Sequence, residues 1–483
     1  MGALNYDVVI VGAGVIGGML ARQLSRYQIR VCLLEKENDV AMGASKANSG
    51  IIHGGYDPIP GTRKAEMNAT GVEPLFQVAR ALDVPCQRNG SMVCAFSPEE
   101  AAQLEELLAQ GRKNGIPGLQ LLTGDEAREL EPCLSPKVTK VLRVTNAGII
   151  SPYELTIAAV GNAMDNGVAL LRNFSVCAIE KTTDAFLVTG EAGQTVQGRY
   201  LVNRAGGASD HIARLAGDEF FKIIPRSGEY MLLDQQEGTR AKHTLFQCPT
   251  AEGKGILVTP TVHGNLLVGP TAAQVATAAS TDTTAAGLKQ VERLAAKTVP
   301  SIEFRQVITS FTGVRASEKH GDFILETSRK VPGLIHGAAI DSPGLTCCVS
   351  IAQRLIQLLE QAGLALIEKE NWNGKRKSPC AFRSLPLEKK KEVICKEPAY
   401  GKIICRCEGV TEGEILEAIR QNPPATDLDG IKRRTRSGMG RCQGGFCSPY
   451  VMQLLSRELG LPMEQVTKSG AGSQLLQGRI GEP

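Results

Sequence analysis

The chain has 483 residues, which is too long for one compact core and predicts two to four domains. Hydrophobic residues make up 42% of the chain and charged residues 22%, as in an ordinary globular protein. Because 54 basic side chains face 50 acidic ones, charge gives no argument for binding nucleic acid or a membrane surface. A local basic run at residues 432–436 is typical of a solvated face.

The location of the protein is indicated by its apolar segments and its cysteines. The longest apolar stretch, residues 8–20, is too short and too rich in glycine to span a bilayer. The N-terminus shows neither the basic region nor the cleavage site of a signal peptide. Fourteen cysteines without such a signal favour reduced thiols or metal ligation over a disulfide framework. We therefore expect a cytoplasmic protein.

The first 35 residues predict a β-α-β unit. Residues 7–11 are a continuous apolar run, which suits a parallel strand buried on both faces. A tight turn at residues 12–18 leads into a helix to residue 26, and a second strand at residues 29–34 ends at Glu35. The turn has the pattern G-x-G-x-x-G, which is formed by Gly12, Ala13, Gly14, Val15, Ile16 and Gly17.

This pattern, between a strand and a helix, is the fingerprint of a dinucleotide site. Gly12 permits the turn, Gly14 lets the backbone approach a pyrophosphate, and Gly17 lets the helix pack against the strand. The pyrophosphate would then lie at a helix N-terminus, and Glu35 would accept hydrogen bonds from ribose hydroxyls. The fingerprint alone does not decide between NAD and FAD.

Later segments alternate helices and strands. Ser97-Pro98 and Ser151-Pro152 each predict a helix start with a capping box to a glutamate three residues after the serine, and the second helix runs to about Asn166. Strands at residues 222–235 and 255–269 suit an antiparallel substrate-binding sheet. A buried strand at residues 333–339 and a helix at residues 344–362 follow.

The composition changes towards the C-terminus. Residues 366–400 are rich in Lys, Glu and Pro, which predicts a linker. A compact segment at residues 401–460 follows, with a capping box at Thr411 for a helix to about Arg420 and a last helix at about residues 449–459. Residues 461–483 form a tail.

The resemblance that decides the cofactor rests on four stretches in matching order. Residues 42–55 resemble the flavin-contacting loop of the glycine oxidase/D-amino-acid oxidase superfamily of FAD enzymes, and residues 202–207 resemble its "VNAAG" segment. Residues 312–315 resemble its substrate-arginine strand, and residues 341–346 resemble its helix start under the isoalloxazine ring. The resemblance covers roughly residues 1–365 and implies FAD. One departure is Arg204, where the superfamily usually has a small residue.

The resemblance implies an α/β Rossmann-type FAD-binding domain interleaved with an antiparallel-sheet substrate domain. The FAD-binding domain would comprise residues 1–75, 150–215 and 320–365, and the substrate domain residues 76–149 and 216–319. The implied FAD-binding residues are Gly12, Ala13, Gly14, Val15, Ile16, Gly17, Glu35, Lys36, Ser45, Asn48, Ser49, Gly50, Ile51, Val176, Ala205, Gly206, Gly344, Leu345 and Thr346.

Oxidising a secondary alcohol on a flavin needs a base for the hydroxyl proton and a cation for an anionic substrate. His53 suits the base, since imidazole titrates near neutral pH, and Arg315 suits the clamp, since its planar fork binds phosphate or carboxylate. A structural histidine and a structural ion pair are the alternatives. Lys254 is a candidate second cation or else a surface lysine, while Ser49 and Ser342 could donate hydrogen bonds. The other five histidines have no motif and are expected to be structural.

Four cysteines form the pattern C-x-C…C-x₄-C, namely Cys405, Cys407, Cys442 and Cys447. Four thiolates suffice for a [2Fe–2S] cluster, and structural zinc is the rival. Residues 434–444 resemble the BFD-like (bacterioferritin-associated-ferredoxin-like) [2Fe–2S] domain, a small helical domain, which favours the cluster. The other ten cysteines, including Cys395, are expected to be buried small hydrophobes.

Within the superfamily, residues 48–61 most resemble type-2 glycerol-3-phosphate oxidases and the A subunit of anaerobic glycerol-3-phosphate dehydrogenase. The resemblance implies oxidation of glycerol 3-phosphate to dihydroxyacetone phosphate by hydride transfer to flavin N5. Electrons would leave through the cluster to a second flavoprotein or another acceptor subunit, and any contact with a membrane would run through that partner. The alternative substrates are a 2-hydroxy acid such as L-2-hydroxyglutarate, or an amino acid. A non-catalytic electron-transfer subunit is disfavoured because His53 and Arg315 are present.

Overall fold

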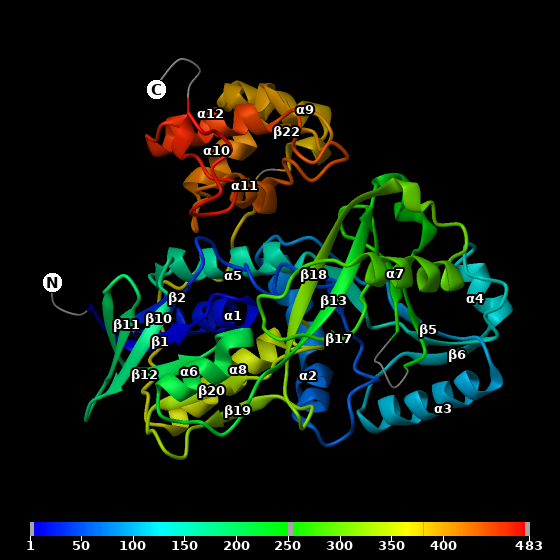
Figure 1. Cartoon of the computed structure of the whole chain (residues 1–483), viewed down its shortest axis with the longest axis horizontal. Helices are drawn as coiled ribbons and strands as arrows, with labels where there is room; N and C mark the ends of the chain where they lie inside the picture. The colour runs from blue at the N-terminus through cyan, green and yellow to red at the C-terminus, as the bar shows by residue number, and fades with distance from the viewer. Residues whose placement is uncertain (1–3, 250–254, 380, 479–483) are drawn as a thin grey trace.

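The computed structural model describes residues 4–249, 255–379 and 381–478. Two large sheets with their helices form the body of the protein, and a small helical module lies against it (Figure 1). The expected α/β fold with a small C-terminal helical module is confirmed. Across the described ranges, no helix has both the length and the apolar character needed to cross a bilayer.

The first sheet has eight strands in the order β10-β11-β12-β1-β2-β9, with β20 paired to β12 and β19 to β20. Its parallel centre follows from the apolar runs, which are buried on both faces. The strands are β1 (Leu4–Val11), β2 (Val31–Leu34), β9 (Ala169–Leu171), β10 (Val176–Lys181), β11 (Phe186–Gly190), β12 (Thr195–Asn203), β19 (Ile324–Thr327) and β20 (Leu334–Ala338).

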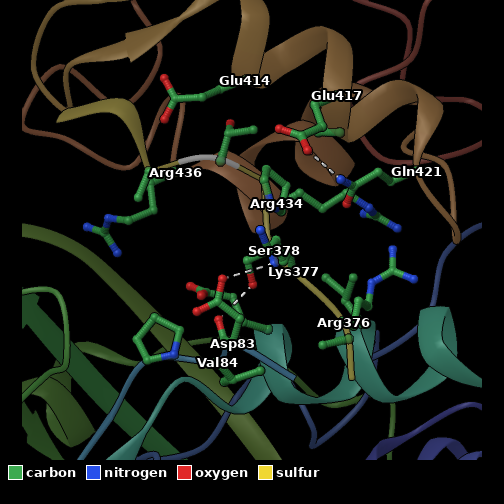
Figure 2. Close-up of a pocket in the computed structure, with 18 of the residues that line it drawn as sticks. Asp83, Val84, Arg376, Lys377, Ser378, Glu414, Glu417, Gln421, Arg434 and Arg436 are labelled. Atoms are coloured by element: carbon green, nitrogen blue, oxygen red, sulfur yellow. Dashed lines mark hydrogen bonds between the residues drawn. The ribbon is translucent and has the colours of Figure 1, made fainter. Parts of the chain in front are cut away.

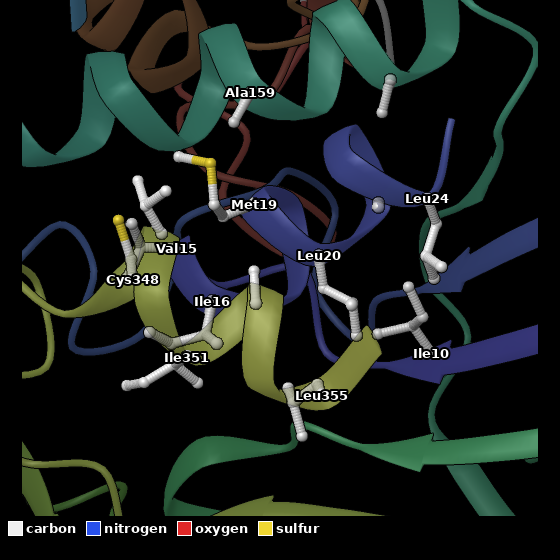
Figure 3. Close-up of a cluster of buried hydrophobic side chains, with 14 of the residues drawn as sticks. Ile10, Val15, Ile16, Met19, Leu20, Leu24, Ala159, Cys348, Ile351 and Leu355 are labelled. Carbon is white, nitrogen blue, oxygen red and sulfur yellow. The ribbon is translucent and has the colours of Figure 1, made fainter. Parts of the chain in front are cut away.

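Helix α1 (Val15–Leu24) is the packing centre on one face of this sheet. Its apolar side chains lie against α5 (Pro152–Asp165) and α8 (Cys348–Gln361), as Figure 3 shows for Met19 beside Ala159. Helix α2 (Arg63–Ala81) joins the same core, whereas α6 (Ser209–Leu215) covers the opposite face. The β-α-β unit expected at the N-terminus is therefore present, and every residue of α1 is buried.

The second sheet has nine strands in the order β17-β13-β16-β15-β14-β5-β7-β6, with β18 paired to β13. The expected antiparallel pairing holds except between β5 and β14, which run parallel. The strands are β5 (Ser91–Ala95), β6 (Leu119–Thr123), β7 (Lys140–Val144), β13 (Ile224–Leu233), β14 (Thr244–Gln247), β15 (Leu257–Pro260), β16 (Leu266–Gly269), β17 (Ala273–Gln274) and β18 (Val307–Ser317).

Shorter elements complete the body. A three-stranded sheet joins β3 (Ile51–Ile52), β8 (Gly148–Ile150) and β4 (Cys86–Gln87). The helices of the second sheet are α3 (Pro98–Lys113), α4 (Gly124–Leu130) and α7 (Ala285–Thr298). Short 3₁₀ turns are η1 (Gly206–Ala208), η2 (Gln235–Arg240), η3 (Phe304–Gln306), η4 (Phe382–Ser384), η5 (Pro398–Gly401) and η6 (Met463–Gln465).

The two serine-proline helix starts differ in their caps. Ser97 Oγ accepts a hydrogen bond from the Glu100 N–H, but the Glu100 carboxylate accepts from Phe96 N rather than closing the box on Ser97. The capping box expected at Ser151 is wrong, because its side chain caps nothing. Glu154 is drawn away by His263, whose Nε2 lies 2.7 Å from Glu154 Oε1.

The C-terminal module has a core of its own. It contains the hairpin β21 (Ile403–Cys405) and β22 (Val410–Thr411) with helices α10 (Glu412–Arg420), α11 (Leu428–Thr435) and α12 (Ser448–Leu459). The capping box of α10 at Thr411 is confirmed.

The segment expected as a linker follows the body before it reaches the module. Trp372 Nε1 donates to Ser25 Oγ at 3.0 Å, and its ring lies beneath the guanidinium of Arg22. Arg376 forms an ion pair with Asp165 of α5. Helix α9 (Leu387–Lys396) then packs beside the module. We call this segment, residues 366–379 and 381–400, the strap. Its polar composition therefore reflects an exposed segment that packs on the body, rather than a flexible linker.

A cleft of about 1680 Å³ lies between the module and the body. Figure 2 shows Asp83 and Arg376 on one side of it and Glu417 and Arg434 on the other. The strap crosses the cleft, where Ser378 Oγ donates to the carbonyl of Asp83 at 2.8 Å.

Asp39 of the body forms buried ion pairs with two arginines of the C-terminal module. Its carboxylate is 2% exposed and accepts hydrogen bonds at 2.7 Å from Arg433 and 2.8 Å from Arg434. Burial raises the pKa of Asp39, but Arg434 and Arg433 outweigh this effect and hold the pKa well below its usual value. The expectation that residues 432–436 form a solvated face is therefore wrong: Arg433 is buried, and the run supplies cations to an acid from a distant segment.

Asp39→Ala is expected to free the module. Two buried guanidinium groups would lose their carboxylate, which costs about 3–5 kcal/mol. The measurement is protease cleavage within residues 381–400 together with chemical unfolding, and the control is Asp7→Ala, which removes an exposed pair with Arg30. Because the folded pKa is depressed, the Asp39 contribution is complete above about pH 4 and is lost only as the pH falls through that pKa. Unchanged cleavage of Asp39→Ala would contradict this role.

Candidate active site and cysteine centre

The glycine turn brings two backbones into direct contact. Gly12 has φ +106°, and a Cβ there would overlap the carbonyl oxygen of Arg204. A Cβ at Gly17 would overlap the carbonyl oxygen of Gly12. At Gly14, by contrast, an added Cβ would meet a side chain, Ser45 Oγ at 3.1 Å, and no backbone atom of another described segment. The backbone of the turn is therefore not covered by another strand at Gly14, where α1 begins and where a dinucleotide fold binds its pyrophosphate.

Glu35 both closes the turn and faces the candidate ligand site. Its carboxylate accepts from Ala13 N at 2.8 Å and from Glu37 N at 3.1 Å. Burial raises the pKa of Glu35. The sequence indicated a ribose acceptor, and the structure adds that Glu35 fixes the turn itself.

The loop at residues 42–55 lies between the two sheets. Ser45 Oγ accepts from Val15 N at 2.8 Å, and Asn48 Oδ1 accepts from Gly50 N at 2.8 Å. A Cβ added at Gly313 would overlap the carbonyl oxygen of Ala47, so this loop packs directly on β18. Ser49 and the substrate strand are thereby brought into the same region.

His53 is held by its backbone and meets Ser342 through its ring. Its N–H donates to Thr346 Oγ1 at 2.9 Å, and its carbonyl accepts from Asn68 Nδ2 at 2.8 Å. The ring Nε2 lies 3.3 Å from Ser342 Oγ, and the ring lies beside that of Phe246. His53, Ser342 and Thr346 are thus brought together, whereas Asn68 was not predicted because it lies on a distant helix without a motif.

Arg315 of β18 lies directly opposite Arg226 of β13. Directly opposite residues of an antiparallel pair face the same side of the sheet, so two guanidinium groups share this surface. Gly228 makes room for the Arg315 side chain, because a Cβ there would lie 2.7 Å from Arg315 Nη2. Arg226 was not predicted from the sequence, whose only signal was a basic residue in a candidate strand. Lys254 lies outside the described residues.

Asp341, next to Ser342, ties its loop to both β18 and α2. Asp341 accepts from Ser317 Oγ at 2.9 Å and pairs with Lys64 Nζ at 2.6 Å. Both charged side chains of this pair are largely buried. These contacts of Asp341 therefore fix the position of the neighbouring Ser342 beside His53.

The remaining expected cofactor residues lie around the carboxyl edge of the first sheet or farther out. Gly50 and Ile51 enter β3, Ala205 and Gly206 follow β12, and Gly344 and Leu345 precede α8, whereas Lys36 is exposed beyond β2 and Val176 begins β10.

The five other histidines take structural or surface positions. His336 is fully buried between Asn203 and Asp218, and burial lowers its pKa. His243 Nδ1 contacts Glu131 at 2.6 Å. His211 and His320 are exposed.

The four expected cysteine ligands come together as two pairs. Cys407 Sγ lies 3.6 Å from Cys442 Sγ, and a hydrogen bond from the Cys447 thiol holds the pKa of Cys405 below its usual value. Within the ranges that the structure describes, no three His, Cys, Asp or Glu side chains gather as for a single metal ion. Two pairs match a [2Fe–2S] cluster, in which each iron takes two thiolates. Among the other cysteines, Cys177 and Cys395 are exposed, which corrects the expectation of burial.

Gly313→Ala is expected to displace the loop at residues 42–55, because the new methyl group would overlap the Ala47 carbonyl. We expect the retained FAD per chain to fall and the melting temperature to drop by several degrees, measured by absorbance and by thermal unfolding. Gly43→Ala in the same loop is the matched control, since a Cβ there would have no neighbour within 4 Å. Equal FAD content in both variants would contradict this packing.

Residues 7–358 match the family described as "FAD dependent oxidoreductase", and residues 403–457 match the "BFD-like [2Fe-2S] binding domain". "Glycerol 3-phosphate dehydrogenase" of Caloramator mitchellensis is 43% identical over 98% of both chains. "Glycerol 3-phosphate oxidase" of Mycoplasma genitalium is 34% identical over 76% of this chain and 97% of its own.

A solved structure of L-alpha-glycerophosphate oxidase from Mycoplasma pneumoniae, with FAD bound, superposes with a TM-score of 0.75 at 32% identity. The superposition covers 78% of this chain and 99% of the Mycoplasma pneumoniae chain. These matches confirm FAD over NAD and a [2Fe–2S] cluster over zinc, and the glycine turn at the start of α1 fits a bound dinucleotide. The chain thus belongs to the FAD dependent oxidoreductase family and carries a BFD-like [2Fe–2S] domain at its C-terminal end.

Proposed function

We propose that the protein is an FAD-dependent glycerol-3-phosphate dehydrogenase. The observation that carries the proposal is the contact of His53 with Ser342, in a fold where Arg315 and Arg226 share one face of the substrate sheet. A secondary alcohol with an anionic end needs a proton acceptor and a cationic clamp of this kind. The relative from Caloramator mitchellensis, named for this activity, matches along nearly the whole chain.

In this proposal each part of the site has one task. FAD, when bound, supplies the hydride acceptor. His53 Nε2 takes the hydroxyl proton, and Ser342 Oγ orients the imidazole and the substrate oxygen. Arg315 and Arg226 bind the phosphate, with Lys254 as a further candidate cation and Ser49 as a hydrogen-bond donor.

The expected cofactor contacts stay part of the same proposal. The pyrophosphate would take the N-terminus of α1 at Gly14, and Glu35 would take a ribose hydroxyl. The loops that contain Ser45, Ser49 and Thr346 would line the flavin side. A 2-hydroxy acid or amino acid is the alternative substrate, because an arginine pair also binds a carboxylate.

We further propose that the electrons leave through the C-terminal module. The relative from Mycoplasma genitalium, named an oxidase, aligns over 97% of its own length with 76% of this chain. The relative from Caloramator mitchellensis, named a dehydrogenase, aligns over 98% of both chains. The acceptor would be a second flavoprotein or another redox subunit in a reducing, cytoplasmic environment. Any membrane association would depend on that partner.

His53→Ala is expected to slow anaerobic bleaching of the flavin by glycerol 3-phosphate roughly 10²–10⁴-fold, the usual effect of losing a positioned base. Stopped-flow absorbance measures this rate, and an unchanged flavin spectrum shows that the cofactor is retained. His320→Ala, which changes an exposed histidine, is the control. Rapid bleaching of the flavin in His53→Ala would show that His53 has a structural role and is not the base.

Cys442→Ser is expected to abolish the visible and EPR signals of the cluster, because a serine oxygen ligates this iron poorly. The FAD-binding body has a separate core, so substrate should still bleach the flavin in one turnover while electron delivery to an external acceptor falls sharply. Cys395→Ser, which changes an exposed cysteine outside the two pairs, is the control. Undiminished delivery by Cys442→Ser would argue for direct transfer from the flavin.

A further inference from the structure

Arg204 carries a buried guanidinium group. The residue is 7% exposed, and its Nε and Nη1 atoms have no hydrogen-bond partner among the residues that the structure describes. No acidic side chain within the described ranges forms an ion pair with it. Burial lowers the pKa of Arg204 to about 9. An unpaired buried cation destabilises a fold, so a persistent one indicates a missing anion.

The backbone places Arg204 next to the glycine turn. It directly follows Asn203, the last residue of β12, and its N–H donates to the carbonyl of Val11 at 2.9 Å. Its own carbonyl oxygen abuts Gly12, where a side chain would overlap it. Arg204 therefore stands at the carboxyl edge of the parallel sheet, beside the start of α1.

The side chain of Arg204 points to the face of the sheet that α1 and α8 cover. Because Asn203 pairs with His336, Arg204 lies beside Gly337 of β20. A Cβ at Gly337 would lie 2.7 Å from Arg204 Nη1 and 3.2 Å from Leu355 Cδ1. Leu355 belongs to α8, and Figure 3 shows α8 packed beside α1. The absence of a side chain at Gly337 thus makes the room that Arg204 occupies.

We propose that Arg204 is a cofactor-binding residue that pairs with the pyrophosphate of FAD. Pyrophosphate is the anionic group that a dinucleotide brings to this edge, at the N-terminus of the first helix. Glu35, the acid that closes the same turn, already accepts from Ala13 and Glu37. The proposal rests on FAD binding and does not depend on which substrate is oxidised.

If Arg204 pairs with the cofactor, its charge affects the stability of the protein in opposite directions without and with FAD. Without FAD, the buried charge destabilises the fold, whereas with FAD it becomes a charge-assisted contact. A neutral side chain of similar size should therefore stabilise the apoprotein and weaken FAD binding. Replacing a purely structural arginine would not stabilise the apoprotein and weaken FAD binding together.

The test uses the full chain stripped of FAD, with Arg204→Met as the variant. Binding of FAD and of ADP-ribose, which shares the pyrophosphate but lacks the flavin, is measured by calorimetry. We expect both affinities to fall by a similar factor of about 10–100, as for loss of a charged hydrogen bond, while the melting temperature of the apoprotein rises. Arg199→Met, which removes an exposed arginine from the same strand, should change neither.

Three results would overturn the proposal. Unchanged affinities would show that Arg204 does not contact the cofactor, and a loss for FAD alone would place it at the isoalloxazine ring. A lower melting temperature of the apoprotein would show a structural role.

A second set of variants covers the case in which Arg204→Met does not fold. Gly337→Ala should displace the guanidinium and weaken FAD binding, whereas Arg204→Ala with Gly337→Ala should bind FAD no worse than Arg204→Ala alone. Unchanged FAD affinity of Gly337→Ala would also overturn the proposal.

Discussion

The close approach of two backbones at the glycine turn fixes the position of every other part of the site. Gly12 donates to the carbonyl of Leu34 at 2.7 Å and abuts Arg204, so β2, β1 and β12 end at the same edge. Because Gly17 also lacks a side chain, α1 can begin at that edge rather than a turn beyond it. Ser45 then accepts from the first turn of α1, and the loop with His53 is positioned from there. A methyl group at either glycine would therefore displace both the cofactor cradle and the candidate base.

Features with a local signal could be predicted from the sequence, and features made by distant segments could not. The β-α-β unit, the cap of α10 at Thr411 and the four cysteine ligands each lie within a short pattern whose geometry the backbone dictates. Asn68 and Arg226 enter the site only because α2 and β13 pack there, so no local pattern marks them. Arg433 was taken for a solvated residue for the same reason, since its acid partner is almost 400 residues away in the chain.

Buried charges in this protein are of two kinds. Asp39 and its arginines satisfy one another within the folded chain, so their desolvation is offset without any ligand. Arg204 has no such partner in the described chain and stands beside the glycine turn, where we propose that it pairs with the cofactor. The first kind holds the C-terminal module against the body, and the second, in our proposal, makes the stability of the body depend on its cofactor. Burial and charge alone do not separate these roles, whereas the presence or absence of a protein partner does.

The contacts of the module place it against the segment that supports the flavin loop. Ile150 of β8 donates to the carbonyl of Gly50 at 2.8 Å, and the chain continues directly into α5. Tyr153, in the first turn of α5, reaches Met439 at 3.6 Å, three residues before Cys442. Arg436 of the module donates to Asn265, which directly precedes β16 of the second sheet, at 3.1 Å. These contacts hold the module, and with it the cysteine pairs, against α5, which directly follows the strand paired to the Gly50 loop. A freely tethered module would not keep this position.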